Sequence, residues 1–66
     1  MKITLNGEEK EVPECLTITG LLEHLQIHPG RVAIEYNLEI LLRSKWPSTQ
    51  IQPGDRLEIV HFVGGG

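Results

Sequence analysis

The sequence has little of what nucleic-acid-binding, secreted or membrane proteins need. Cys15 is its only cysteine, which rules out an internal disulfide and is typical of a reducing compartment. Its six basic residues are dispersed and outnumbered by nine acidic ones, which disfavours binding to a phosphate backbone. No apolar run has the length of a membrane span or resembles a signal peptide. We therefore expect a cytoplasmic protein that binds neither nucleic acid nor membrane.

The chain is also too short to hold a catalytic cleft with its own substrate pocket. Its 66 residues suffice for one small domain that buries about 60% of the surface of its unfolded chain. We expect a single domain over residues 1–66 that acts as a binding module or carrier rather than as an enzyme.

The first half of the chain predicts a hairpin and then a helix. Apolar residues alternate with polar ones over positions 1–5, Asn6-Gly7 is a hairpin turn, and residues 9–12 form a weak, charged return strand. Thr17 is a plausible N-cap. Behind it, four aliphatic side chains fall on one helical stripe that needs a sheet to cover it: Ile18, Leu21, Leu22 and Leu25. Pro29-Gly30 ends the region.

The second half predicts three more strands. Alternation predicts one over residues 32–37, a turn over 37–39 leads to a short apolar strand at 40–42, and residues 43–46 can form one helical turn. Pro53-Gly54 suits a type II turn before the last strand, residues 56–63. The order is that of an α+β domain: a mixed sheet packed on one helix, with the first and last strands parallel and central. The expected core includes Leu5, Leu21, Leu25, Ile34, Leu57 and Ile59.

The last strand carries an apolar pair on the side that should face water. Arg56 and Glu58 belong in solvent, so alternation places Val60 and Phe62 on the same face. We interpret this pair as a docking patch for a partner, because exposed apolar clusters often mark interfaces. The alternative is that a loop or the chain end covers it.

The glycines 64–66, here called the glycine tail, are the candidate reactive segment. Without a Cβ atom such residues can enter a narrow channel, and three of them reach roughly 10 Å when extended. A free α-carboxyl group has a pKa of about 3.5, so it is ionised at neutral pH and must be activated before it can be attacked. We hypothesise that the carboxylate of Gly66 is the reactive group. The alternative is a frayed terminus.

Other chemically active side chains predict no site. His24 and His28 have a spacing of four that can bind metal on a helix, but solvated histidines explain them better, and we expect no metal. His61 should be partly buried on the inward face, and Cys15 should be a small buried hydrophobe. Trp46 should form a lid over the rim of the core.

Taken together, the chain resembles the ThiS family of sulfur carrier proteins of thiamin biosynthesis, which have the ubiquitin-like β-grasp fold. The resemblance covers the whole chain. The residues that carry it are 1–7, the leucine-rich helix, 32–37, Ile40, Arg43, Trp46, Gly54-Asp55 and 59–66. Gly64 departs from the family pattern only as a third glycine.

The resemblance implies a carrier that other enzymes act on. A ubiquitin-activating-like adenylyltransferase would use ATP to adenylate Gly66, while Gly64 and Gly65 thread its channel. A sulfur donor of the cysteine desulfurase persulfide type would convert the adenylate to a thiocarboxylate. Thiazole synthase would take that sulfur. The carrier would bind no cofactor itself, since the partner uses the ATP.

Three alternatives share this fold or this ending. One is a sulfur donor similar to the small subunit of molybdopterin synthase. Another is a ubiquitin-like modifier, whose Gly66 would be joined to lysines of target proteins. The third is a β-grasp interaction module with an inert tail.

Overall fold

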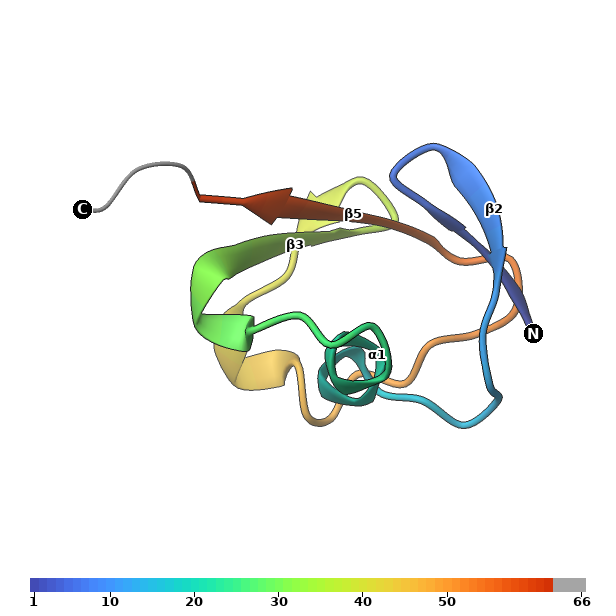
Figure 1. The fold of residues 1–66 in the computed structure, drawn as a ribbon, viewed down its shortest axis with the longest axis horizontal. Coiled ribbons are helices and arrows are strands. Elements are labelled where there is room, and N and C mark those ends of the chain that lie inside the picture. The colour runs from blue at the N-terminus through green and yellow to red at the C-terminus, as the bar shows by residue number, and fades with distance from the viewer. Residues whose placement is uncertain (63–66) are drawn as a thin grey trace.

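The computed structural model describes residues 1–62, which form a five-stranded sheet with an α-helix packed on one side (Figure 1). The α+β class predicted from the sequence is therefore confirmed. The strands are β1 (Lys2–Leu5), β2 (Glu8–Glu11), β3 (Val32–Tyr36), β4 (Glu39–Ile40) and β5 (Arg56–His61). The helical segments are α1 (Ile18–His24) and two 3-10 helices, η1 (Pro29–Arg31) and η2 (Arg43–Lys45).

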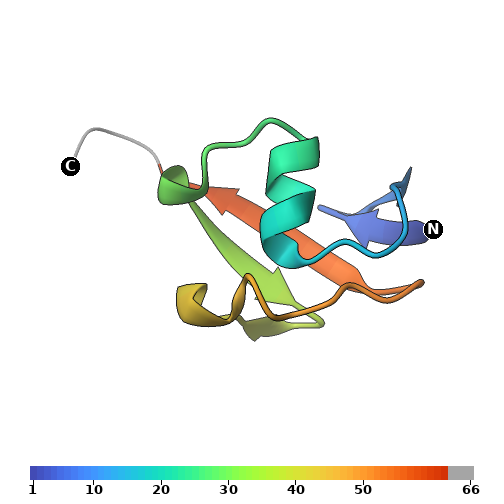
Figure 2. The same cartoon turned by 90° about the horizontal axis from the view of Figure 1, so that it is seen from below.

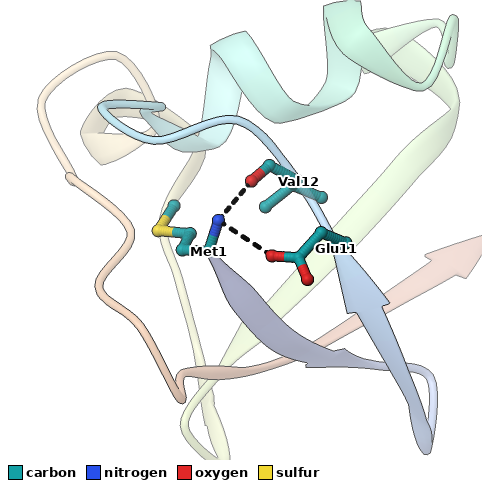
Figure 3. A network of polar contacts seen from close by, with 3 residues as sticks. All are labelled: Met1, Glu11 and Val12. Atoms are coloured by element: carbon teal, nitrogen blue, oxygen red, sulfur yellow. Dashed lines mark hydrogen bonds and ion pairs between the residues drawn. The ribbon is translucent and has the colours of Figure 1, made fainter.

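The hairpin β1–β2 forms as its turn residues predict. Asn6 and Gly7 have φ angles of 51° and 82°, a left-handed pair that matches the twist of a tight hairpin. At the open end, the amino group of Met1 donates to the carbonyl oxygen of Val12 at 2.6 Å and lies 3.2 Å from Oε2 of Glu11 (Figure 3). Since the side chain of Glu11 is largely exposed, the backbone bond contributes more than the ion pair.

Helix α1 begins where its cap predicts and ends earlier than expected. The hydroxyl of Thr17 accepts a hydrogen bond from the backbone N–H of Gly20 at 3.1 Å. Leu25 is already the C-cap, and Gln26 has a φ of 59°, so the helix stops before the Pro29-Gly30 signal is reached. His28 instead caps η1. The placement of His24 and His28 on one helix was therefore wrong.

The sheet order is β2-β1-β5-β3-β4, with β5 in the middle. Strands β1 and β5 are parallel, with Leu5 opposite Leu57, while β3 runs antiparallel to β5. The predicted central pairing of the first and last strands is confirmed. Figure 2 shows α1 crossing over the face of β5. The apolar stripe of α1 and the inward side chains of the sheet form one buried cluster.

The core lies between α1 and this inner face. Its buried members are Ile3, Val12, Ile18, Leu21, Leu22, Val32, Ile34, Trp46, Ile51, Leu57 and Ile59. Leu5 and Leu25 are only half-buried against it, Leu25 because it sits at the helix end. Trp46 is 3% exposed and so is part of the core rather than its lid.

Two further details concern the loop before α1 and the length of the helices. Cys15 is exposed and has a φ of 64°, so the expectation of a buried thiol was wrong: the chain turns there, just before the helix cap, and directs the side chain to solvent. Within residues 1–62, no helix is both long and apolar enough to cross a membrane.

Leu21 and Leu25 lie on the same helix stripe but are buried to different extents, so truncating each to alanine should lower the stability by different amounts. Leu21→Ala should lower the free energy of unfolding by about 2–5 kcal/mol, because a fully buried Leu leaves a cavity. Leu25→Ala should cost less, since part of that side chain already contacts water. Urea denaturation of both variants measures the two losses. An equal or larger loss at Leu25 would contradict this placement of the helix end.

Candidate docking face and carboxyl-terminal segment

Strand β5 is fixed at its start by a polar network. A carboxylate oxygen of Asp55, Oδ2, accepts from the backbone N–H of Gln52 at 2.7 Å and from the hydroxyl of Tyr36. Asn37 lies next to it, and its Oδ1 accepts from the backbone N–H of Arg56 at 2.9 Å. These bonds tie the predicted turn at residues 52–55 to the end of β3, and so set where β5 begins.

This network raises the pKa of Tyr36. Partial burial raises the pKa of its phenol, and the hydrogen bond to Asp55 and the charge of that carboxylate raise it further, to about 12. The folded state therefore favours the neutral phenol, which can donate to the carboxylate.

Asn6 holds β5 further along. Its Oδ1 accepts from the backbone N–H of Ile59 at 2.7 Å, and its Nδ2 donates to the carbonyl oxygen of the same residue at 3.4 Å. Its own backbone N–H donates to the carbonyl oxygen of Leu57 at 2.9 Å. Asn6 thus continues the pairing between β1 and β5 past the end of β1, and the position of β5 is set on both sides.

The apolar pair at the end of β5 faces solvent, as its alternation predicts. Val60 is 49% exposed and Phe62 is 61% exposed. The backbone N–H of Phe62 donates to the carbonyl oxygen of Arg31 at 2.9 Å, which continues the register between β3 and β5 past His61. The ladder therefore still holds the backbone at Phe62, the last described residue.

His61 is exposed, which contradicts the expected partial burial. It occupies an inward position by alternation, but it is the last residue of β5, and burial along that side of the strand stops at Ile59. Alternation fixes the side of the sheet on which a residue lies, not whether another layer reaches far enough to cover it.

A second exposed apolar group lies at the edge of the sheet and was not predicted from the sequence. Leu38, Ile40 and Leu42 are 71%, 77% and 63% exposed. Strand β4 is Glu39–Ile40 at the edge of the sheet, so the strand expected at 40–42 was placed too late in the chain and shares only Ile40 with β4. The period-2 spacing of the three residues was the available signal, but it was obscured because Leu41 between two of them is also apolar.

Two of the residues that carried the family resemblance act in the fold. The guanidinium of Arg43 donates to the carbonyl oxygens of Pro29 and, at 2.9 Å, Val32, and lies 4.5 Å from the ring centroid of Trp46. The indole N–H of Trp46 donates to the carbonyl oxygen of Leu41 at 3.1 Å. Together they join both ends of the β3–β4 region to η2.

The glycine tail lies outside the described residues. The expectations for Gly64, Gly65 and Gly66 therefore stay predictions, as does the expected role of Val60 and Phe62 in partner binding. What the structure gives is the location from which the tail departs: the exposed end of the central strand.

Comparisons with known proteins identify the family. The family model described as "ThiS family" matches residues 3–66. The chain belongs to the ThiS family. This ThiS-family chain is 37% identical to the "Sulfur carrier protein ThiS" of Bacillus subtilis over 65 residues, which cover 97% of the chain and 98% of that protein.

The solved structures give the same fold. The crystal structure of a thiamine biosynthesis protein (ThiS) from Geobacter metallireducens matches with a TM-score of 0.87 and 36% identity, and covers both chains completely. The resemblance to a ubiquitin-like β-grasp fold, a mixed sheet with one helix, is thereby confirmed.

Another relative is much longer than this ThiS-family chain. It is the "Thiazole synthase" of Paramagnetospirillum magneticum, 42% identical over 66 residues, and these span the whole chain but only 20% of that protein's length. A second protein of that name, from Magnetococcus marinus, shows 41% identity with the same coverage. The chain thus spans about a fifth of the length of these two relatives.

The Tyr36–Asp55 contact predicts a titration that can be measured directly. Tyr36 is the only tyrosine, so the ultraviolet absorbance of the phenolate reports it alone. Its pKa should be about 12, and Asp55→Asn should lower it toward the usual value near 10. Since the pKa is raised on folding, the contribution to stability is complete below about pH 10 and is lost as the pH rises through about 12. An unchanged titration in Asp55→Asn would contradict this assignment.

Proposed function

We propose that this chain is a sulfur carrier of thiamin biosynthesis, with the carboxylate of Gly66 as the group that carries sulfur. The observation that supports this most is the match to the Bacillus subtilis sulfur carrier protein, which covers 97% of this chain and 98% of that one. A match over nearly the full length of both chains leaves little of either protein to hold a different site.

The chemistry follows from the poor reactivity of a carboxylate. A carboxylate oxygen of Gly66 attacks the α-phosphorus of ATP on an adenylating partner, and pyrophosphate leaves. The resulting acyl-adenylate has AMP as a good leaving group. The outer sulfur of a persulfide donor of the cysteine desulfurase type then attacks the acyl carbon and releases AMP, which leaves an acyl disulfide between Gly66 and the donor. A thiol, which acts as the reductant, attacks the donor's sulfur in that S–S bond, so that Gly66 leaves as a thiocarboxylate and the donor is left in a disulfide with the thiol. In this proposal the chain is a co-substrate rather than an enzyme: it binds no cofactor, and the ATP belongs to the partner.

The described geometry supports docking next to this reaction. Val60 and Phe62 are exposed on the central strand, immediately before the segment that ends in Gly66. A partner that covers these side chains buries apolar surface while Gly64 and Gly65 enter its channel without side-chain clashes. The backbone hydrogen bond between Phe62 and Arg31 anchors the chain four residues before Gly66.

Thiazole synthase is the proposed acceptor of the sulfur. The two long relatives of that name each contain a segment that matches this chain from end to end. A carrier-like segment within such a protein is consistent with a carrier that must meet the enzyme. We place the pathway in the cytoplasm, where the lone cysteine would stay reduced.

Deleting Gly66 tests the reactive position. The deletion draws the carboxylate back by about 3.5 Å, and a misplacement of 1 Å can cost a reaction about a hundredfold. ATP–pyrophosphate exchange with the cognate adenylating enzyme should therefore be lost, and adding one residue after Gly66 should abolish it equally. Unchanged melting temperatures serve as the control for folding. Equal exchange by the native, shortened and extended chains would refute the carrier proposal.

Replacing Gly65 with a bulky residue should block exchange as well, although the carboxylate is unmoved. The expected loss comes from the side chain alone, since a narrow channel has no room for it. Normal exchange by Gly65→Trp would refute the threading of the tail.

Phe62→Ala tests the docking patch separately from the chemistry. Because Phe62 is 61% exposed, the variant should keep its melting temperature. It should bind the adenylating enzyme more weakly by roughly 1–3 kcal/mol, measured by calorimetry. Ile59→Ala, an inward neighbour on the same strand, should instead lose stability. Normal binding by Phe62→Ala with a large loss of stability would contradict the proposed patch.

A further inference from the structure

The outer face of the sheet holds two like charges in direct opposition. Strands β3 and β5 are antiparallel, and Glu35 on one is the register partner of Glu58 on the other. The next outward pair along the same ladder is Ala33 with Val60. Figure 1 shows α1 and the other helical turns below the sheet, which leaves the upper side of β3 and β5 uncovered by any described element.

This acidic pair has no ionic partner in the described part of the chain. The ion pair present within residues 1–62 joins the amino group of Met1 to Glu11, on the other side of the sheet order from β3. Like charges directly opposite each other on neighbouring strands destabilise a sheet. Both glutamates are half-buried rather than fully solvated, which strengthens their repulsion. The repulsion between these two glutamates therefore lowers the folding stability of the free domain.

Apolar side chains flank the acidic pair along β5 toward its carboxyl end and across the sheet on β4, while Arg56 lies one outward step from Glu58 on the other side. Ile40 is the register partner of Glu35 on its other side, and it is 77% exposed. Val60 lies one outward step from Glu58 along β5, and Phe62 one step further. Two carboxylates that lie beside exposed apolar side chains are complementary to a basic side chain with apolar neighbours.

The inference rests on the proposed function, which supplies the occupant. Gly66 is only four residues beyond Phe62, so a partner that holds its carboxylate lies over or beside this face. A second copy of the chain fits less well, because its net charge of −3 opposes self-association.

We propose that the adenylating enzyme docks on this face by placing an arginine or lysine over Glu35 and Glu58, with apolar contacts to Val60 and Phe62. An arginine fits best, because its planar guanidinium can donate to both carboxylates at once. Docking neutralises the repulsion between the glutamates, so the strain in the free carrier is released only when the partner is bound.

A structural role and a docking role for the acidic pair have opposite signatures. If the glutamates existed to hold the fold, neutralising them would weaken it. If they bind a cation on the partner, neutralising them removes a repulsion from the free carrier and an attraction from the complex. Folding stability should then rise while affinity falls.

The test compares two double variants that change the net charge equally. Glu35→Gln/Glu58→Gln removes the acidic pair, whereas Glu14→Gln/Glu23→Gln removes two exposed carboxylates away from β3 and β5. Each carrier is titrated into the cognate adenylating enzyme by calorimetry at low and at physiological salt. Thermal unfolding and the kinetics of ATP–pyrophosphate exchange are measured on the same samples.

The proposal predicts that Glu35→Gln/Glu58→Gln melts a few degrees higher than the native chain. Its Kd for the enzyme should be weaker by about tenfold or more, with a smaller dependence on salt. In exchange it should raise KM for the carrier and leave kcat unchanged, since Gly66 is untouched. The control pair should match the native chain in Kd and in KM.

Three results would overturn the proposal. An unchanged Kd would show that no cation meets the pair, and a lower melting temperature would show that the pair supports the fold. Sedimentation that reveals a dimer broken by the same variant would assign the face to a second copy. In each case the native chain still supports exchange, so the sulfur-carrier proposal stands. Absence of both binding and exchange by the native chain would instead refute the proposed function, and this inference with it.

Discussion

The double pairing of β5 is the constraint on which the rest of the structure depends. This strand is parallel to β1 on one side and antiparallel to β3 on the other, so it cannot shift without breaking both ladders. Its inward residues, Leu57 and Ile59, pack under the helix. Hydrogen bonds of Asn6 and Asp55 add to these pairings: those of Asp55 fix the turn before β5, and those of Asn6 hold β5 at Ile59. These pairings and hydrogen bonds hold the chain in place up to Phe62, from which the segment that contains the glycine tail continues.

Alternation along that strand divides the domain into two tasks. One side supplies the core; the other presents Glu58, Val60 and Phe62 to solvent. Buried and outward-facing residues alternate along its six positions, so truncating Val60 removes little buried surface from the core. Arg43 and Trp46 belong to the first task, because their contacts are with backbone carbonyls and with each other.

Local patterns in the sequence predicted most of this arrangement. Asn6-Gly7, the Thr17 cap and the charges that fix the phase of β5 each act over a few residues, so they can be read directly. The failures depend on contacts between distant segments. Gln26 ends the helix in a left-handed conformation that no glycine marks, Trp46 is drawn into the core by packing against other segments, and the edge position of β4 leaves Ile40 in solvent. The pairing of Glu35 with Glu58 was likewise hidden, because register between strands is not visible in either strand alone.

The central claim is that sulfur is carried at the carboxyl end of this chain. Intact-mass spectrometry of the protein purified from cells that make thiamin tests it most directly, followed by fragmentation to locate the change. The account predicts a species heavier by the difference between one sulfur and one oxygen atom, with the added mass on Gly66. An unmodified carboxylate under sulfur-replete conditions, or heavier species in which Gly66 is joined to lysines of other proteins, would contradict it.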